Sequence, residues 1–358
     1  MVLGAKRVGK TVLIKKILAS LSEPFLSLNG EDISVHDKLA TRTVENYRQI
    51  IGSYRLVYID EAQKIPDIGL KLKLMIDEIE GLKIIISGSS SFDIFNEAGE
   101  PLTGRKYSFV LFAFSENELS QLENPIIKSD RVKERLVFGN YPELLQLPDH
   151  KDKIDYLNEL VSSYLLKDIL AYENIKNSQK IFNLLRLIAF QIGGEVSLQE
   201  LGKQLGISKN TVEKYLDLLS KVYILHRVEG FSRNLRKEIT KNSKWYFFDN
   251  GIRNAVIANF NLLDSRNDSG PLWENYLISE RLKTQEYNRI SCNNYFWRTY
   301  DQQEIDWVEE RGGSLYGYEF KWSEGKVKIP PTWKNAYPNA FFEVINQSNF
   351  SEWLNEKG

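Results

Sequence analysis

The sequence predicts an α/β protein: a parallel sheet core with helices on both faces, then an all-α region, and last a small α+β domain. Three observations support this. Over residues 1–115, short apolar runs typical of strands alternate with segments of helical period. Over residues 116–248, helical periodicity dominates. From residue 249 onward, the composition shifts to aromatic residues and short strand-like runs. The predicted domains are 1–115, 116–178, 179–248 and 249–358.

Composition narrows the function classes. The 358 residues carry a net charge of −1, so any contact with nucleic acid depends on a local patch and not on a global field. Cys292 is the sole cysteine and there are three histidines, which excludes a disulfide framework and argues against a Cys- or His-based metal centre. No signal-peptide pattern and no apolar run of membrane-spanning length is present. We therefore expect a cytoplasmic protein with no membrane partner.

Residues 4–11 read Gly-Ala-Lys-Arg-Val-Gly-Lys-Thr and fit the phosphate-binding pattern G-x-x-x-x-G-K-[ST]. Its glycines let backbone N–H groups curl around a phosphate. Lys10 is expected to reach the β- and γ-phosphates, and Thr11 to bind Mg²⁺. The helix that follows, 12–20, points its positive end at the anion. The sequence therefore predicts a P-loop NTPase core that binds ATP and Mg²⁺ through Gly4, Ala5, Lys6, Arg7, Val8, Gly9, Lys10, Thr11 and Val12.

The strand before this loop is short. Only Val2 and Leu3 precede Gly4 as strand-forming residues, whereas a strand at the centre of a sheet usually has about five. We therefore expect that the start codon lies upstream or that the chain is truncated, and that ATP binds weakly.

A second part of a nucleotide site follows at residues 56–61, Leu-Val-Tyr-Ile-Asp-Glu. Four apolar residues that run into two acids indicate a buried parallel strand, and open α/β sheets bind ligands at the carboxyl ends of such strands. Asp60 is expected to hold Mg²⁺ and its water shell. Glu61 is expected to orient and deprotonate the attacking water. The alternative is an ordinary strand followed by a solvated acidic turn.

The next strand, 82–86, ends in Ser87-Gly88-Ser89-Ser90. A hydroxyl here is placed to sense the γ-phosphate, with Ser87 and Ser89 as candidates and a plain turn as the alternative. Arg105 is the next cation along the chain, and an arginine near the nucleotide stabilises transferred charge, in cis or across a subunit interface. A surface arginine is equally consistent with the sequence.

The rest of the first domain follows the same alternation. Residues 24–35 predict a strand and a turn, 40–51 a helix, and 107–112 a further strand. Together with the strands above, this order is typical of a parallel sheet with helices on both faces.

Several of these motifs resemble the AAA-type ATPases of a prokaryotic family with the C-terminal domain DUF4143. The resemblance covers nearly the whole chain. It implies an ATPase core, a winged helix and a nuclease-like C-terminal domain. It rests on the loop at 4–11, Asp-Glu-Ala-Gln at 60–63, Ile-Ser-Gly-Ser-Ser at 86–90, Gly-Arg at 104–105, Gly-Asn-Tyr-Pro-Glu at 139–143 and Tyr-Phe-Phe-Asp-Asn-Gly at 246–251.

Residues 116–178 predict a helical lid over the nucleotide or a simple connector. Ser115 and Glu118 have capping-box spacing. Helical stretches then run to residue 136, after a break at Pro125, and from 153 to 172, with a turn at 141–143 between them.

Residues 179–248 predict a winged helix. An apolar-faced helix, 181–192, precedes a helix-turn-helix pattern in which Gly206 ends one helix and Ser208 caps the next, 209–219. The basic excess that follows favours contacts with DNA phosphates, and protein packing is the alternative. Its basic residues are Arg227, Arg233, Arg236, Lys237, Lys241 and Lys244, against Glu229 and Glu238.

The C-terminal region predicts a restriction-endonuclease-like α+β fold. A helix at 271–281 precedes strands at 295–299, 304–309 and 315–322, and Gly312-Gly313 turns the last two into a hairpin. A second Mg²⁺ site is predicted at Glu274, Asp306 and Glu319, with Lys321 beside it, in the D…E-x-K pattern of metal-dependent nucleases. The alternative is a surface ladder of charge pairs.

The function expected from these parts is an ATP-hydrolysing or ATP-switched machine whose C-terminal half contacts DNA, with homo-oligomerisation possible. The alternative is an ATP-binding regulatory or scaffold protein whose C-terminal half only recognises partners. The two differ in whether Asp306, Glu319 and Lys321 converge at metal-binding distance.

Overall fold

The computed structural model describes residues 1–89, 104–124, 128–165, 178–232, 243–325 and 327–356. The chain divides into two compact units. The first comprises Met1–Ala113 with Lys221–Tyr223, and the second comprises Phe114–Ser220 with Ile224–Gly358.

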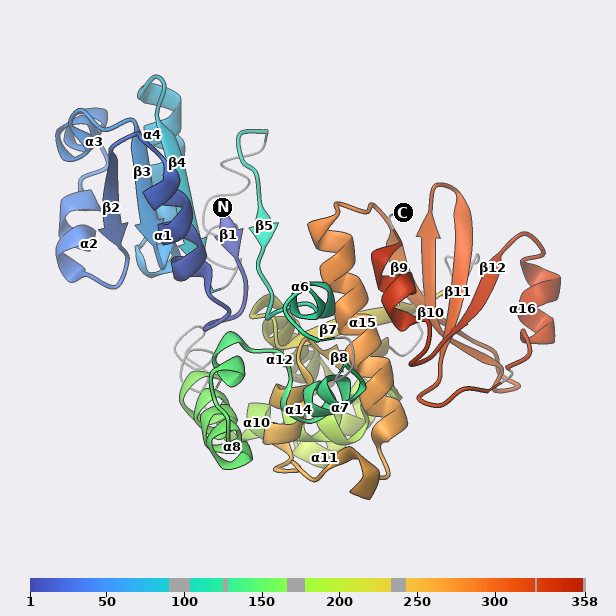
Figure 1. Cartoon of the computed structure of the whole chain (residues 1–358). Coiled ribbons are helices and arrows are strands. Elements are labelled where there is room, and N and C mark those ends of the chain that lie inside the picture. Colours follow the sequence, from blue (N-terminus) through green and yellow to red (C-terminus); the bar gives the residue numbers. More distant parts are fainter. Residues whose placement is uncertain (90–103, 125–127, 166–177, 233–242, 326, 357–358) are drawn as a thin grey trace. The chain divides into compact units, whose positions relative to one another are not determined.

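The first unit is the α/β fold that the sequence predicts, with five parallel strands in the order β2-β3-β4-β1-β5 (Figure 1). The strands are β1 (Val2–Leu3), β2 (Phe25–Asn29), β3 (Leu56–Asp60), β4 (Lys83–Gly88) and β5 (Phe109–Val110). The helices are α1 (Lys10–Ser20), α2 (Ile33–Ala40), α3 (Val44–Ile51) and α4 (Ile68–Glu78), with a 3₁₀ turn at Ala62–Lys64.

The short strand β1 is integrated into this sheet. It pairs with β4 on one side, Val2 opposite Ser87, and with β5 on the other, Val2 opposite Phe109. The loop that follows β1 therefore emerges inside the sheet, next to the end of β4.

Strand β3 shows why helices cover both faces. Leu56 and Tyr58 pack in a cluster with Ile14 and Leu18 of α1. The alternate residues of β3 pack into a larger cluster with α2, α3 and α4 on the other face. Since successive side chains on a strand point to opposite faces, an apolar run without polar interruption is what a doubly covered strand requires.

The helix expected at 40–51 is shorter, and an unexpected helix precedes it. The expected helix is α3, which starts at Val44, whereas α2 lies mostly before residue 40, partly where a strand and a turn were expected. The Asp32 side chain accepts a hydrogen bond from the backbone N–H of Ser34 at 2.8 Å and caps the start of α2. Thr43 caps α3 in the same way, through the N–H of Asn46 at 3.3 Å. Side-chain capping by these two residues defines the helix starts.

The second unit combines helices with one seven-stranded mixed sheet in the order β12-β11-β10-β9-β7-β8-β6. Its strands are β6 (Glu195–Val196), β7 (Leu225–Gly230), β8 (Ser243–Phe247), β9 (Asn293–Arg298), β10 (Glu304–Arg311), β11 (Ser314–Phe320) and β12 (Phe341–Ile345). The predicted hairpin is confirmed, with Arg311 opposite Ser314.

The helices of the second unit lie before, between and after these strands in sequence. They are α6 (Glu116–Ser120), α7 (Lys128–Phe138), α8 (His150–Glu159), α10 (Ser178–Phe190), α11 (Leu198–Leu205), α12 (Lys209–Lys221), α14 (Asn250–Val256), α15 (Ser269–Tyr287), α16 (Pro331–Ala336) and α17 (Phe350–Asn355). Short 3₁₀ turns are Pro142–Leu145 and Leu263–Ser265, and Leu160–Leu165 is π-helical. The capping box of Ser115 and Glu118 is confirmed at the start of α6. The predicted break at Pro125 lies outside the described residues, as does the predicted helix beyond residue 165.

The sheet runs through the boundary expected at residue 248. Strand β7 pairs in parallel with β9, Glu229 opposite Tyr295, so the strands after the helix-turn-helix segment and those of the C-terminal hairpin form one sheet. Such a pairing joins residues more than sixty positions apart, which local periodicity does not reveal.

Candidate functional site

The loop between β1 and α1 has a backbone that requires its glycines. Gly4 has φ +144°, and a Cβ there would lie 2.0 Å from the carbonyl oxygen of Leu111. Gly9, with φ +99°, is the N-cap of α1. A side chain at either position would be strained, and at Gly4 it would also clash with the backbone after β5.

Lys10 lies inside this loop. Its Nζ donates to the carbonyl oxygens of Gly4 at 3.0 Å and Ala5 at 2.8 Å, and the residue is only 5% exposed. Burial lowers the pKa of Lys10 to about 8, although the charges of Glu61 and Asp60 oppose this shift. The ammonium is thus bound by neutral carbonyls, which a phosphate oxygen would outcompete as a partner.

Asp60, at the end of β3, joins three elements. Its carboxylate accepts hydrogen bonds from Thr11 Oγ1 of α1, at 3.1 and 3.3 Å, and from Ser87 Oγ of β4. A hydroxyl and a carboxylate at one point are the oxygen ligands that Mg²⁺ takes in phosphate-binding sites. Thr11 and Asp60 therefore fit the metal that ATP would bring.

Glu61 follows in a left-handed conformation, φ 47°. Its Oε2 accepts from Gln63 Nε2 at 2.5 Å, and the same nitrogen donates to Ser89 Oγ at 3.0 Å. Gln63 thus ties Glu61 to the end of β4. Sequence reasoning gave Gln63 no role, although its position two residues after Glu61 was a usable signal.

Ser87 and Ser89, both candidates for sensing phosphate, lie differently. Ser87 is fully buried, donates to Asp60 and lies 3.1 Å from the hydroxyl of Tyr58. Ser87 therefore contacts Asp60 and has no exposed surface to offer a ligand. Ser89 is the serine that connects to Glu61, through Gln63.

Arg105 does not join the nucleotide loop within the chain. It forms an ion pair with Asp77, one residue before the end of α4. Because α4 begins after the carboxyl end of β3 and leads back to the start of β4, this pair lies at the far end of the sheet from Lys10. Of the other loop residues, Arg7 has φ 58°, Val8 is buried and Val12 is 60% exposed.

The carboxylates predicted to bind a second Mg²⁺ are near one another, since the charges of Glu274 and Glu319 both act on Asp306. Each is engaged by the protein. Asp306 accepts from the backbone N–H of Phe320 at 2.8 Å, and Glu319 binds Lys321 Nζ at 2.7 Å. Burial raises the pKa of Asp306 well above its usual range, and Glu274 and Glu319 raise it further.

Glu274, the helix carboxylate of this group, is on α15. It accepts from the hydroxyl of Tyr246 at 2.6 Å and lies 3.6 Å from Lys244 Nζ. Within the described ranges, no three His, Cys, Asp or Glu side chains are grouped so that they could hold a metal ion. Glu274, Asp306 and Glu319 do not form such a group in this structure, and the Mg²⁺ site expected there stays a prediction.

The predicted basic patch also changes. Lys244 is 1% exposed and bonded to Glu304, so it has no surface for a DNA phosphate. Arg227 is exposed and lies 3.1 Å from Glu229. The other four basic residues, Arg233, Arg236, Lys237 and Lys241, lie outside the described residues.

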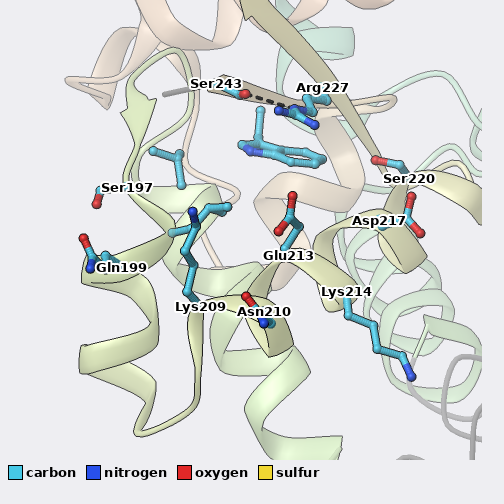
Figure 2. A pocket seen from close by; sticks show the side chains of 13 residues that line it. Ser197, Gln199, Lys209, Asn210, Glu213, Lys214, Asp217, Ser220, Arg227 and Ser243 are labelled. Atoms are coloured by element: carbon cyan, nitrogen blue, oxygen red, sulfur yellow. Dashed lines mark hydrogen bonds between the residues drawn. The ribbon is translucent and has the colours of Figure 1, made fainter. Parts of the chain in front are cut away.

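A cavity of about 870 Å³ lies beside the helix-turn-helix segment. Figure 2 shows Lys209 and Glu213 of α12 on one side and Arg227 with Ser243 on the other, joined by a hydrogen bond of 2.9 Å. Its lining is polar and of mixed charge: Val196, Ser197, Leu198, Gln199, Lys209, Asn210, Glu213, Lys214, Asp217, Ser220, Arg227, Ser243 and Trp245.

Within the described part of the chain, no helix is both long and apolar enough to cross a membrane.

Comparison with known families divides the chain into three matches. An AAA domain matches residues 1–120, a domain of unknown function (DUF8612) matches 129–263, and another domain of unknown function (DUF4143) matches 269–340. The middle match spans both boundaries expected at 178 and 248.

The relatives found are themselves uncharacterized. A Mycobacterium tuberculosis protein is 25% identical over 321 residues, which is 89% of this chain and 69% of that protein. A Methanocaldococcus jannaschii protein is 23% identical, covering 85% of this chain and 70% of its own length. Among solved structures, AMPPCP-bound DnaA from Aquifex aeolicus is 14% identical with a TM-score of 0.29, covering 61% of this chain and 80% of its own, a likeness too low to support an inference.

The AAA match coincides with the parallel sheet and its glycine loop, and the DUF4143 match coincides with α15 and the C-terminal hairpin. The chain therefore combines an AAA domain of the P-loop ATPase type with a C-terminal DUF4143 domain.

Proposed function

We propose that the first unit hydrolyses ATP with Mg²⁺ and that this cycle drives or switches a second unit that contacts DNA. The observation that carries the first half is the meeting of Lys10, Thr11 and Asp60 at the carboxyl end of the sheet, with Glu61 next in the chain. Open α/β sheets bind their ligands at this edge.

In this proposal each residue has one role. Lys10 exchanges the carbonyl oxygens of Gly4 and Ala5 for the β- and γ-phosphates. Thr11 and Asp60 hold Mg²⁺, which offsets the phosphate charge when it is bound. Glu61 takes the proton of the attacking water, and Gln63 with Ser89 holds its carboxylate in place.

Glu61→Gln should trap ATP. The amide keeps the size of the side chain but cannot accept the proton, so we expect turnover to fall about 10²-fold or more while the Kd for ATP changes little. Phosphate release at saturating ATP measures the turnover, and titration calorimetry measures the Kd for ATP. Glu45→Gln, an exposed carboxylate on α3, is the matched control. Undiminished hydrolysis would place the general base elsewhere.

The second half of the proposal rests on the helix-turn-helix segment. Helices α11 and α12 are joined at Gly206, φ 62°, and Ser208 caps α12 through the N–H of Thr211 at 3.1 Å. The strands beside them are ordered β7-β8-β6. Three helices with such a sheet are the parts of a winged helix, which supports DNA as the partner.

The alternative, a partner-recognition module without cleavage, also has support. Glu213 and Asp217 on α12 line the cavity of Figure 2. Their negative charges would repel a phosphate backbone that approached α12 on this side. The carboxylates of Glu274, Asp306 and Glu319 each bind a protein group, which supports a role without a catalytic metal. We therefore propose recognition of DNA without hydrolysis of it.

DNA affinity should fall steeply with salt, because each neutralised phosphate releases counterions. Glu213→Gln should raise the affinity about two- to fivefold, since unit charges about 4 Å apart in water interact by about 1 kcal/mol. Fluorescence anisotropy of a labelled duplex at about 50 and 200 mM salt measures both. Glu45→Gln, in the first unit, should change neither. A binding constant independent of salt would contradict DNA binding through phosphates.

A further inference from the structure

Lys244 lies at the centre of the carboxylate group of the second unit. It projects from β8 and is 1% exposed. Its Nζ lies 2.5 Å from Glu304 of β10 and 3.6 Å from Glu274 of α15. The ring of Phe296 on β9 covers it at 5.3 Å. Four separate elements thus enclose one ammonium group.

The other carboxylates of the group have protein partners of their own. Lys321 binds Glu319, and its charge also acts on Asp306 and Glu274. Asp306 accepts from the N–H of Phe320. Glu274 shares its Oε1 between Tyr246 and Lys244. We call Glu274, Glu304, Asp306 and Glu319 with Lys244 and Lys321 the lysine–carboxylate cluster.

Buried carboxylates this close repel one another unless a cation offsets their charge. In metal-dependent nucleases a divalent ion supplies that charge. Here the chain supplies it, from a strand that belongs to the DUF8612 match and not to the DUF4143 match. Burial alone would lower the pKa of Lys244, but the charges of Glu274, Glu304 and Asp306 raise it above its ordinary value, so the ammonium stays charged.

We propose that Lys244 is the built-in cation of the lysine–carboxylate cluster. Its ammonium group offsets the negative charge of the carboxylates, as a divalent ion does in a nuclease. The cluster then joins β8, α15 and the C-terminal hairpin as a structural unit and leaves no position for a catalytic metal. This deepens the proposed function, because it makes the DNA-facing unit one that binds and does not cleave.

The parent protein provides the first test, without nucleotide. All seven tryptophans lie between residues 245 and 353, so tryptophan fluorescence reports melting of the second unit alone. We expect the same Tm with EDTA as with Mg²⁺ or Mn²⁺, and no nicking of supercoiled plasmid. A metal-dependent rise in Tm that Asp306→Asn abolishes would overturn the proposal.

The variant Lys244→Met, which keeps the length of the side chain and removes its charge, provides the second test. Its Tm should fall by about 5 °C or more, and Mn²⁺ should recover part of the loss because it binds the folded state only. Lys203→Met, an exposed lysine on α11, should change neither value. A parent-like Tm, or a loss that Mn²⁺ does not recover, would overturn the proposal.

If Lys244→Met does not fold, the double variant Lys244→Met with Glu304→Gln removes one charge of each sign and should fold. Failure of this double variant as well would reduce Lys244 to a packing role and overturn the proposal. ATP turnover is measured separately on the parent. Its absence would count against the proposed function alone, because the metal measurements contain no nucleotide.

Discussion

Lys10→Ala should abolish ATP binding and leave the first unit folded. The variant removes the cation matched to the β- and γ-phosphates. The fold should survive because the side-chain hydrogen bonds of Lys10 are with two carbonyl oxygens of its own loop, those of Gly4 and Ala5. Titration calorimetry with ATP and Mg²⁺ measures the loss, and circular dichroism checks the fold. Lys16→Ala, an exposed lysine on the same helix, is the control. Equal binding by Lys10→Ala and the parent would disprove the assignment of the site.

The same lysine predicts a pH dependence. Its pKa is lowered by burial to about 8, so in the free protein the ammonium is present below pH 8 and lost above it. ATP affinity should therefore be constant below about pH 7 and fall by up to about tenfold per pH unit above pH 8. Binding at pH 9 should take up a proton, because the phosphates raise the pKa of Lys10. Calorimetry in buffers of different ionisation enthalpy detects this uptake.

Arg281→Met should destabilise the second unit by about 3 kcal/mol, because it leaves the buried charge of Glu309 with Arg311, 3.4 Å away, as its remaining ionic partner. Both side chains are 0% exposed, and their two hydrogen bonds measure 2.6 and 2.9 Å. Arg281 also donates to the carbonyl oxygen of Trp353 at 2.9 Å, and its guanidinium lies 5.1 Å from that ring. Urea unfolding followed by tryptophan fluorescence measures the loss.

Two further variants separate this effect from a general loss of packing. Arg281→Met with Glu309→Leu removes both fully buried charges and should recover much of the stability, with Arg311 keeping its ion pair with Glu356 at 3.8 Å. Arg131→Met, in the exposed pair with Glu134, should cost under about 1 kcal/mol. If Arg281→Met cost no more than Arg131→Met, the Arg281–Glu309 pair would not contribute as a buried pair should.

Sequence patterns are enough to predict the nucleotide loop, the strand that ends at Asp60 and the alternation of strands and helices around them. These signals are local: a glycine pattern, an apolar run and a helical period each involve neighbouring residues. The hairpin at Gly312-Gly313 and the turn at Gly206 are local in the same sense. The starts of α2 and α3 differ from the prediction because they are set by side-chain caps at Asp32 and Thr43, which the helical period does not show.

The partners of the charged residues could not be predicted from the sequence, because they depend on the folded chain. Lys244 looked like a DNA contact and is held by carboxylates, and Arg105 looked like a nucleotide contact and pairs with Asp77. Arg281 and Glu309 belong to no sequence motif, yet they form a fully buried ion pair. The sequence does not distinguish a lysine or arginine that binds a ligand from one that forms an ion pair inside the protein. The difference depends on residues that long-range pairings, such as β7 with β9, bring near it. Patterns of neighbouring residues do not predict these long-range contacts.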